Sequence, residues 1–303
     1  MKEIVLITGA SGTLAKSVAK KLQNDGFEVL FYSSSINIVN DKNIFYWDVE
    51  NKIFDKSPLD KCSHIIHLSG YSVINKWTEK NKKKMYSSRV NAAKLLFDYC
   101  KEKEINIKTF ISASAIGYYG FDSIGLKNEN DLPSKDWLSK LAVDWESAAT
   151  AFEGIDSRVI KLRISLILTK TTGFLKPILL SMKLGVAPIL GSRKQSFEWI
   201  HLDDLANFIL FSLKNKNVSG VYNLATDNKT NQEEFLNIIK NKYFKYSLLL
   251  KIPTFVLTLL LGKRIKIVTS DIAVSVEKLM STGFKFQYPN VDIAIDKEFK
   301  YKK

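Results

Sequence analysis

Two glycines near the N-terminus form the clearest candidate for chemistry. The run Gly9-Ala10-Ser11-Gly12-Thr13-Leu14-Ala15 has the spacing G-x-x-G-x-x-A between a short apolar run and a segment of helical periodicity. Gly9 would permit a tight turn, and Gly12 would let the backbone approach a pyrophosphate. The N-terminus of the following helix would offer N–H donors to the phosphates. We predict a dinucleotide-binding loop, and an ordinary glycine-rich turn is the alternative. Its expected cofactor contacts are Gly9, Ser11, Gly12, Thr13, Leu14 and Lys16.

The residues after the second predicted strand bear on the choice between NADP and NAD. An aspartate or glutamate at this place would bind the ribose 2′-hydroxyl of NAD. The sequence instead reads Tyr32-Ser33-Ser34-Ser35 and contains no acid there. A 2′-phosphate would meet hydroxyl donors at Ser33 and Ser34 and a cation at Lys16. The pattern favours NADP(H), and NAD stays the alternative because no arginine stands at the strand end.

Two further strand ends carry candidate cofactor residues. Asp48 and Val49 follow the third predicted strand, where an adenine ring would lie, although Asp48 could equally be a plain turn aspartate. Leu68, Ser69 and Gly70 end the fourth strand. Ligands of open α/β folds bind at the carboxyl ends of such strands.

The elements that must position these residues alternate along the chain. Apolar, β-branched runs predict strands at 2–8, 27–32, 43–47, 64–68, 108–112 and 158–162. Helical patterns lie between them, including one long helix over about 79–102 and another over about 135–152. This alternation predicts an α/β fold with a Rossmann-type, doubly wound parallel sheet. We place the Rossmann domain at 1–225, with 165–200 contributing to the substrate side, and a smaller, mostly helical domain at 226–303.

The second half offers local signals. Thr230 to Glu233 has the pattern of a capping box that opens a helix to about residue 240, and Asp203 is placed to cap a helix over 205–213. The most apolar stretch, 247–261, is interrupted by Lys251 and Pro253, so it is too short to span a bilayer. We expect a buried helix there, with contact to a membrane or a partner as the alternative.

Composition limits the class of protein. The chain has 303 residues, 46% of them hydrophobic and 25% charged, as in ordinary globular proteins. Its net charge of +14 suits phosphate-bearing ligands, nucleic acid or anionic membranes. The lysines at 80, 82, 83 and 84 cover several sides of a helix, which is typical of a solvated surface. Two cysteines, Cys62 and Cys100, fit a reducing compartment. We therefore expect a cytoplasmic protein with no nucleic-acid, membrane or metal partner, and a homodimer stays open.

The motifs resemble a known family. TGASGTLA at 8–15, HLSG at 67–70 and SASAIGYYG at 112–120 are similar to extended short-chain dehydrogenases/reductases of the NAD-dependent epimerase/dehydratase type. More specific matches resemble an atypical branch whose members are usually labelled epimerase family proteins and carry a C-terminal domain of unassigned function. These matches are Lys76-Trp77-Thr78, Ser88-Arg89, Trp145-Glu146, GSRKQ at 191–195, WIHLDD at 199–204 and GFKFQYP at 283–289. The resemblance covers nearly the whole chain.

The resemblance implies a catalytic group of serine, tyrosine and lysine. Ser114 falls at the serine position and Lys140 at the lysine position, but Asp136 stands where the tyrosine is expected. Tyr118 or Tyr119 could supply the missing phenol, Asp136 could itself accept a proton, or the protein could bind a dinucleotide without turnover. The structural alternatives are a surface pair of Asp136 with Lys140 and packing of the two tyrosines under a loop.

The remaining candidates concern the substrate and the cofactor side. Arg163, at the end of the sixth strand, would suit a carboxylate or phosphate, and Arg89 is a cofactor-side or sheet-anchoring candidate. The other predicted substrate residues are Tyr119, Gln195, Trp199 and His201, although Trp199 could be core. Taken together, we expect an NADP(H)-binding oxidoreductase or epimerase-like enzyme for a small molecule. The alternative is a non-catalytic dinucleotide-binding sensor or interaction protein, since relatives are sometimes labelled cell-division inhibitors.

Overall fold

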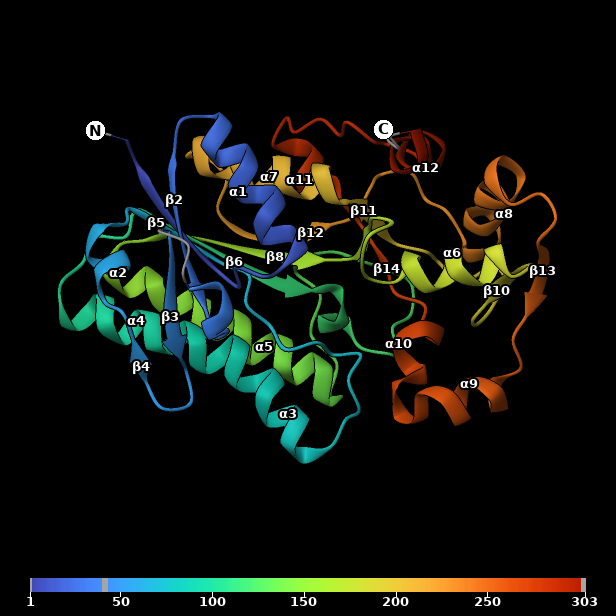
Figure 1. Ribbon diagram of the computed structural model, residues 1–303, viewed down its shortest axis with the longest axis horizontal. Helices are drawn as coiled ribbons and strands as arrows, with labels where there is room; N and C mark the ends of the chain where they lie inside the picture. Colours follow the sequence, from blue (N-terminus) through green and yellow to red (C-terminus); the bar gives the residue numbers. More distant parts are fainter. Residues whose placement is uncertain (1, 40–42, 301–303) are drawn as a thin grey trace. The chain divides into compact units, whose positions relative to one another are not determined.

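A mostly parallel sheet of eight strands organises the first part of the chain (Figure 1). The computed structural model describes residues 2–39 and 43–300. The strands lie in the order β12-β8-β6-β5-β1-β2-β3-β4. They are β1 (Ile4–Thr8), β2 (Glu28–Ser33), β3 (Ile44–Asp48), β4 (Ile53–Phe54), β5 (His64–His67), β6 (Thr109–Ala115), β8 (Arg158–Ile164) and β12 (Gly220–Leu224). The chain adds β2 and β3 on one side of β1 and then β5, β6 and β8 on the other. This reversal confirms the predicted doubly wound, Rossmann-type sheet.

The register aligns the carboxyl ends of the central strands. Thr8 pairs with Tyr32 of β2 and with His67 of β5, and His67 pairs with Ser112 of β6. Val5, Leu6 and Ile7 of β1 are fully buried, as expected of a central parallel strand covered on both faces. The residues that follow β1 and β5 therefore come to one edge of the sheet, at the point where the strand order reverses.

Helices cover both faces of this sheet. Figure 1 shows α1 (Thr13–Asn24) and α7 (Leu202–Lys214) along one face, and α4 (Ala92–Glu102) and α5 (Trp137–Thr150) along the other. The short helix α2 (Ser57–Lys61) precedes β5. The predicted long helix over 79–102 is interrupted, because a π-helical turn at Ser87–Asn91 separates α3 (Glu79–Tyr86) from α4. Such turns insert a residue into a helix and often occur at functional sites.

The chain divides into two compact units. The first contains residues 1–115, 140–163 and 206–222, and the second contains 116–139, 164–205 and 223–303. The chain thus enters the second unit three times. Two of these segments, 116–139 and 164–205, lie entirely within residues 1–225, which were predicted to form the Rossmann domain. The predicted boundary at 225 stays a prediction.

The second unit holds three two-stranded sheets and several helices. The sheets pair β9 (Leu166–Leu168) with β11 (Trp199–His201), β10 (Val186–Ile189) with β13 (Leu248–Lys251), and β7 (Leu126–Lys127) with β14 (Ala273–Val274). The helices are α6 (Leu175–Lys183), α8 (Gln232–Tyr243), α9 (Thr254–Leu261), α10 (Ile265–Thr269), α11 (Glu277–Ser281) and α12 (Val291–Lys300). One apolar core joins α6, β11, α8 and α12, with Trp199 fully buried in it.

Three local predictions in this unit, the caps of α8 and α7 and the burial of the apolar stretch, differ from the structure. The capping box of α8 is formed by Asn231 and Glu234, one residue later than predicted, because the Asn231 side chain accepts from the Glu234 N–H. His201 rather than Asp203 caps α7, since its Nδ1 accepts from the Asp203 N–H at 3.1 Å. The expected buried helix over the apolar stretch is also wrong, because α9 buries only Leu257. No helix in the described ranges is long and apolar enough to cross a bilayer.

Candidate active site

The turn between β1 and α1 depends on glycine for its shape. Gly9 adopts φ +85°, and a Cβ there would lie 3.1 Å from the Ser69 Cα and 3.3 Å from the Leu68 carbonyl oxygen. Its N–H donates to the Tyr32 carbonyl at 3.1 Å. A side chain at residue 9 would therefore strain the backbone and collide with the neighbouring strand end.

The start of α1 presents backbone donors at this edge. Gly12 is the N-cap residue, and its N–H donates to the Gly9 carbonyl at 2.9 Å. In the described part of the chain no side chain caps this helix, and its first turn contains no acidic residue. A Cβ on Gly12 would lie 3.1 Å from the Gly9 oxygen. Ser11 and Lys16 are exposed, while Thr13 and Leu14 are half-buried. The positive end of the helix dipole thus lies where an anionic diphosphate would be stabilised.

A buried hydrogen-bond network fixes the neighbouring strand end. The Thr8 hydroxyl oxygen accepts from the N–H groups of Leu68 and Ser69, both at 3.0 Å, and lies 2.9 Å from His67 Nδ1. His67 Nε2 lies 2.9 Å from the Arg89 carbonyl, which can only accept. Nε2 therefore carries the proton, and the Thr8 O–H donates to Nδ1. Full burial lowers the pKa of His67 to about 4, so the ring is neutral near pH 7.

Arg89 lies against the turn that follows β5. Its Nη1 donates to the carbonyls of Tyr71 at 2.9 Å and Met85 at 3.1 Å, and its guanidinium lies 5.0 Å from the Trp145 ring centre. A Cβ on Gly70 would come within 2.8 Å of Arg89 Nη2, so this glycine leaves room for the cation. Burial lowers the pKa of Arg89 to about 10, which still leaves it charged at pH 7. The π-helical turn places this arginine beside Ser69 and Gly70.

The serines after β2 have different environments. Ser33 is buried, and its Oγ accepts from the Ser35 N–H at 3.0 Å in a local turn. Ser34 is exposed. Tyr32 stacks on Trp47 with ring centres 5.2 Å apart, which stiffens this strand end. Of the predicted 2′-phosphate contacts, Ser34 and Lys16 are exposed and Ser33 is buried, and contact of any of them with a cofactor stays a prediction.

Asp48 has the geometry of a turn aspartate, which was the alternative to its predicted contact with the cofactor. Its Oδ1 accepts from the N–H groups of Glu50 and Asn51, and its Oδ2 accepts from the Asn51 side-chain amide at 2.8 Å. These hydrogen bonds, above all those from Asn51, hold the pKa of Asp48 below its usual value. Val49 is half-buried. A cofactor contact at either residue stays a prediction.

Ser114 belongs to a buried charged cluster that the sequence did not reveal. Its hydroxyl donates to Glu146 Oε1 at 2.7 Å, and Arg163 binds both oxygens of Glu146 at 2.8 and 2.9 Å. All three side chains are at least nine-tenths buried. Arg163 was expected to meet a substrate anion, but its guanidinium instead pairs with this internal carboxylate. The sequence offered one signal for this cluster, because Trp145-Glu146 is part of the family resemblance. That resemblance assigned no role to the glutamate.

Asp136 and Lys140 have structural partners. Asp136 Oδ1 accepts from the N–H groups of Leu138 and Ser139, both at 3.0 Å, and its Oδ2 accepts from the Phe121 N–H at 3.3 Å. This is the geometry of a helix N-cap. Lys140 forms an exposed i,i+4 pair with Asp144 at 3.3 Å. The predicted surface pair of Asp136 with Lys140 is therefore replaced by a cap and a different pair.

The two tyrosines after β6 differ in burial. Tyr119 is buried, and its hydroxyl hydrogen-bonds to the Asn128 carbonyl at 2.9 Å and to Asn223 Oδ1 at 2.8 Å. Its ring meets that of Tyr118 edge-on at 5.4 Å. Tyr118 is half-buried. Tyr119 thus has the packing role that was its alternative, and Tyr118 is the phenol more open to a ligand.

The remaining predicted substrate residues lie inside the second unit. Gln195 is buried and donates to the carbonyls of Val268 and Ser270 at 3.2 and 2.7 Å. Trp199 is core, as its alternative stated. His201 Nε2 lies 3.1 Å from Glu298 Oε1, and its Nδ1 accepts from the Asp203 N–H, so both ring nitrogens have partners within the protein. Contact of these residues with a substrate stays a prediction.

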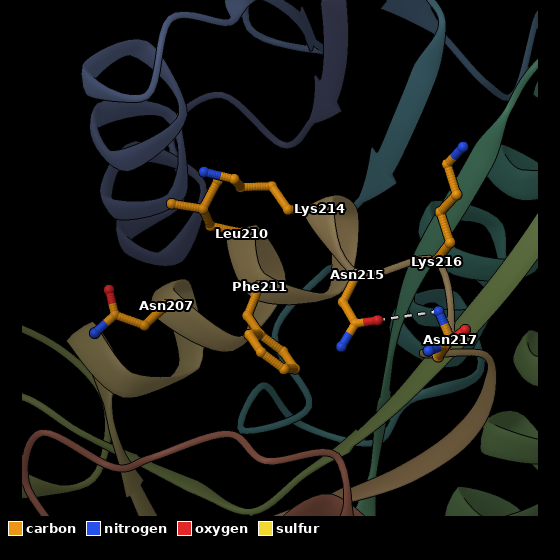
Figure 2. A pocket seen from close by; sticks show the side chains of 7 residues that line it. All are labelled: Asn207, Leu210, Phe211, Lys214, Asn215, Lys216 and Asn217. Atoms are coloured by element: carbon orange, nitrogen blue, oxygen red, sulfur yellow. Dashed lines mark hydrogen bonds between the residues drawn. The ribbon is translucent and has the colours of Figure 1, made fainter.

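Figure 2 shows a pocket elsewhere in the first unit, over α7 and the turn after it. Asn207, Leu210, Phe211 and residues 214–217 line it, and Lys214 pairs with Asp25 at 2.9 Å. None of the predicted cofactor or substrate residues lines this pocket. Over the described residues, no group of three or more His, Cys, Asp or Glu side chains is placed to hold a metal ion.

Comparison with known sequences identifies relatives over the whole length. The model of the NAD dependent epimerase/dehydratase family matches residues 5–225, and a domain of unknown function, DUF1731, matches residues 252–298. The chain is 28% identical over 293 residues to an epimerase family protein of Staphylococcus aureus, covering 96% of this chain and 97% of the relative. It is 29% identical over 298 residues to an epimerase family protein of Staphylococcus haemolyticus, with the same coverage.

Solved structures share the fold. The human epimerase family protein SDR39U1, solved with NADPH, superposes with a TM-score of 0.86 at 23% identity, covering 98% of this chain and 99% of the human chain. UDP-glucuronic acid 4-epimerase from Bacillus cereus, solved with UDP-glucuronic acid and NAD, gives a TM-score of 0.79 at 15% identity and covers 98% of each chain. At these identities the likeness concerns the fold alone. The family match over residues 5–225, on a doubly wound sheet with a glycine turn at its switch point, shows that the chain belongs to the NAD-dependent epimerase/dehydratase family.

Proposed function

We propose that this protein is an NADP(H)-dependent oxidoreductase or epimerase-like enzyme that acts on a hydroxyl- or carbonyl-bearing carbon of a small molecule. The observation that carries the proposal is the turn at Gly9 to Gly12. It combines a left-handed glycine, a close approach to Ser69, and an uncapped helix start at the carboxyl edge of the sheet. Backbone N–H groups in this arrangement suit a diphosphate.

NADP(H) is proposed over NAD(H) because of the strand end after β2. Neither Ser33, Ser34 nor Ser35 carries a negative charge that would repel a 2′-phosphate, and Lys16 is exposed at the start of α1. The human structural neighbour was solved with NADPH, whereas the Bacillus cereus epimerase was solved with NAD. The choice therefore depends on the local charge at this strand end.

The dinucleotide proposal is tested by fluorescence titration of the purified protein with NADPH and NADH. We expect saturable NADPH binding, weaker NADH binding, and loss of both in Gly12→Val, whose side chain would enter the space beside the Gly9 oxygen. Gly154→Val is the matched control, because no atom lies within 4 Å of a Cβ at that glycine. Absence of NADPH binding to the unmodified protein at millimolar cofactor would remove the proposal.

The chemistry proposed for this chain starts at Ser114. A bound nicotinamide would supply or accept a hydride. Ser114 would hold the substrate oxygen, while Glu146 fixes the orientation of the serine hydroxyl by accepting its hydrogen bond and Arg163 pairs with that carboxylate. Tyr118 is the proposed proton donor or acceptor, with Asp136 and Lys140 as the other catalytic candidates. Asp136 is the weaker acceptor candidate, because both of its oxygens already accept backbone hydrogen bonds.

A second function is favoured by a specific observation. Ser114, Asp136 and Lys140 each have a partner in the described residues that explains their presence without catalysis. A dinucleotide-binding sensor or interaction protein without turnover would need only the glycine turn.

A substrate panel separates the two functions. The panel contains carbonyl compounds and nucleotide sugars, which are chosen because the Bacillus cereus neighbour binds UDP-glucuronic acid. Turnover that is lost in Tyr118→Phe and reduced in Lys140→Ala supports the enzyme. NADPH binding with no turnover on any member of the panel favours the sensor.

A further inference from the structure

An exposed apolar helix distinguishes the second unit from an ordinary protein surface. The eight residues of α9 have the sequence TFVLTLLL, and Phe255 and Leu259 are 74% and 85% exposed. They are four residues apart and therefore share one side of the helix. Leu260 beside them is 66% exposed. Strand β13, which precedes α9 in the chain, carries two further exposed leucines, Leu248 and Leu250. We name these five side chains the α9 patch.

The segment of the chain that carries the α9 patch has charges of a single sign. Residues 244–270 contain no aspartate or glutamate, and their basic residues are Lys245, Lys251, Lys263, Arg264 and Lys266. Lys251 precedes the helix, Lys263 follows it, and both are exposed. Lys251 stands four residues before Phe255, and Lys263 stands four residues after Leu259. Cations therefore lie at both ends of the apolar row.

We propose that the α9 patch binds the surface of an anionic lipid bilayer. Exposed phenylalanine and leucine side chains with lysines at either end of the helix can bury their apolar tips among lipid chains while the cations stay in the aqueous headgroup region. The apolar tips would enter the boundary of the acyl chains, and the lysines would extend to the lipid phosphates. The helix has eight residues, far fewer than the about 20 needed to span a bilayer. The contact is therefore peripheral and reversible.

Charge complementarity decides against a second copy of the chain as the occupant. Both ends of α9 are basic, so two copies of the helix packed side by side would bring lysines against lysines in either orientation. Like charges at such a contact are destabilising. An anionic surface meets the same lysines with the opposite sign. The sequence-based expectation of no membrane partner rested on the length of the apolar run, which bears only on spanning, and on the expected burial of this helix, of which the structure buries only Leu257.

The test is sedimentation of the full chain with vesicles of phosphatidylcholine alone or with about 30% phosphatidylglycerol. We expect binding only to the anionic vesicles and loss of binding at about 0.5 M salt, where surface charges are screened. Lys251→Gln with Lys263→Gln should weaken binding at least about tenfold, since each lysine near an anionic surface changes affinity by about fivefold. Phe255→Ser with Leu259→Ser should weaken it by a similar factor or more.

The matched control replaces two other exposed apolar residues of the same unit. Ile124→Ser with Leu132→Ser alters side chains that are 86% and 85% exposed, and it should leave vesicle binding unchanged. Thermal unfolding verifies that each variant is folded. No binding of the unmodified chain to anionic vesicles overturns the proposal, as does binding that the α9 substitutions leave intact. A concentration-dependent dimer that Leu259→Ser abolishes, without vesicle binding, would assign the patch to a second copy. NADPH titration is measured separately, so the two proposals fail independently.

Discussion

At the scale of single residues, the cluster of Ser114, Glu146 and Arg163 carries the largest energetic consequence. A buried ion pair that loses one partner leaves an uncompensated charge, which typically costs about 3–5 kcal/mol. We expect Glu146→Ala to lower the free energy of unfolding by this amount, as measured by urea denaturation. The double variant Glu146→Leu with Arg163→Met should be closer to the native stability because it removes both charges. Equal losses in the two variants would contradict this account.

His67 makes stability depend on pH. Burial lowers its pKa from 6.5 to about 4, so the unfolded chain binds a proton that the folded chain refuses between these values. The contribution of neutral His67 to the free energy of unfolding is therefore fully present above about pH 6.5 and is lost as the pH falls toward about 4. The loss should approach about 3 kcal/mol, at 1.4 kcal/mol per pKa unit. Urea denaturation between pH 7 and 4.5 measures this slope, and His67→Gln should flatten it. An unchanged slope in that variant would refute the assignment.

Sequence reasoning was most informative at residues whose position depends on the backbone. Gly9 and Gly12 were predicted from their spacing and Gly70 from its place after a strand, and each lies where a Cβ would meet a neighbouring atom, while their contact with a cofactor stays a prediction. It was less informative for charged side chains such as Arg163, because the pairing with Glu146 joins positions 17 residues apart. Their spacing in the sequence does not show that helix and strand bring them together.

At the scale of elements, Asp136 tests whether a cap or a proton acceptor occupies the start of α5. Asp136→Ala should cost about 1 kcal/mol of stability, since N-cap removal typically has this effect. Asp136→Asn keeps the acceptor oxygen of the cap, removes the carboxylate, and gives up only the longer hydrogen bond from the Phe121 N–H at 3.3 Å. We expect the asparagine variant to keep its thermal stability, and any NADPH-dependent turnover, at nearly the native level. A stable asparagine variant without turnover would instead assign Asp136 to catalysis.

The boundaries of elements show where periodicity reaches its limit. Six strands of the central sheet, β1, β2, β3, β5, β6 and β8, were predicted within a few residues because they are apolar, β-branched runs, whereas the two-residue strand β4 was not predicted. The π-helical turn at Ser87–Asn91 was missed, since one inserted residue leaves the apolar periodicity of α3 and α4 nearly intact. A helix was predicted over the apolar stretch that forms α9, but its exposure was not, because an apolar composition by itself indicates burial.

At the scale of the whole molecule, the sheet and its family could be predicted, whereas the path of the chain through the two units could not. Periodicity assigns each segment a helix or a strand, but it does not state which segments share a core. The core around Trp199 combines residues from 168–199 with residues from 235–295, which are far apart in sequence.

Cofactor binding should stabilise the folded chain as a whole-molecule effect. A ligand present at 100 times its dissociation constant adds about 2.7 kcal/mol to the free energy of unfolding. We expect NADPH to raise the melting temperature measured by calorimetry and to slow hydrogen exchange at residues 4–16 more than at residues 254–269. Equal protection of both segments would argue against binding at the β1–α1 turn.

The threefold entry of the chain into its second unit restricts how the protein can be dissected or recombined. Truncation after residue 225 would remove α8 and α12 and leave Phe197 and Trp199 without the side chains that cover them. We therefore expect that neither fragment, 1–225 nor 226–303, folds stably on its own. A single crossover at residue 225 would likewise separate the two halves of this core, so we expect chimaeras of two relatives joined there to be less stable than either parent.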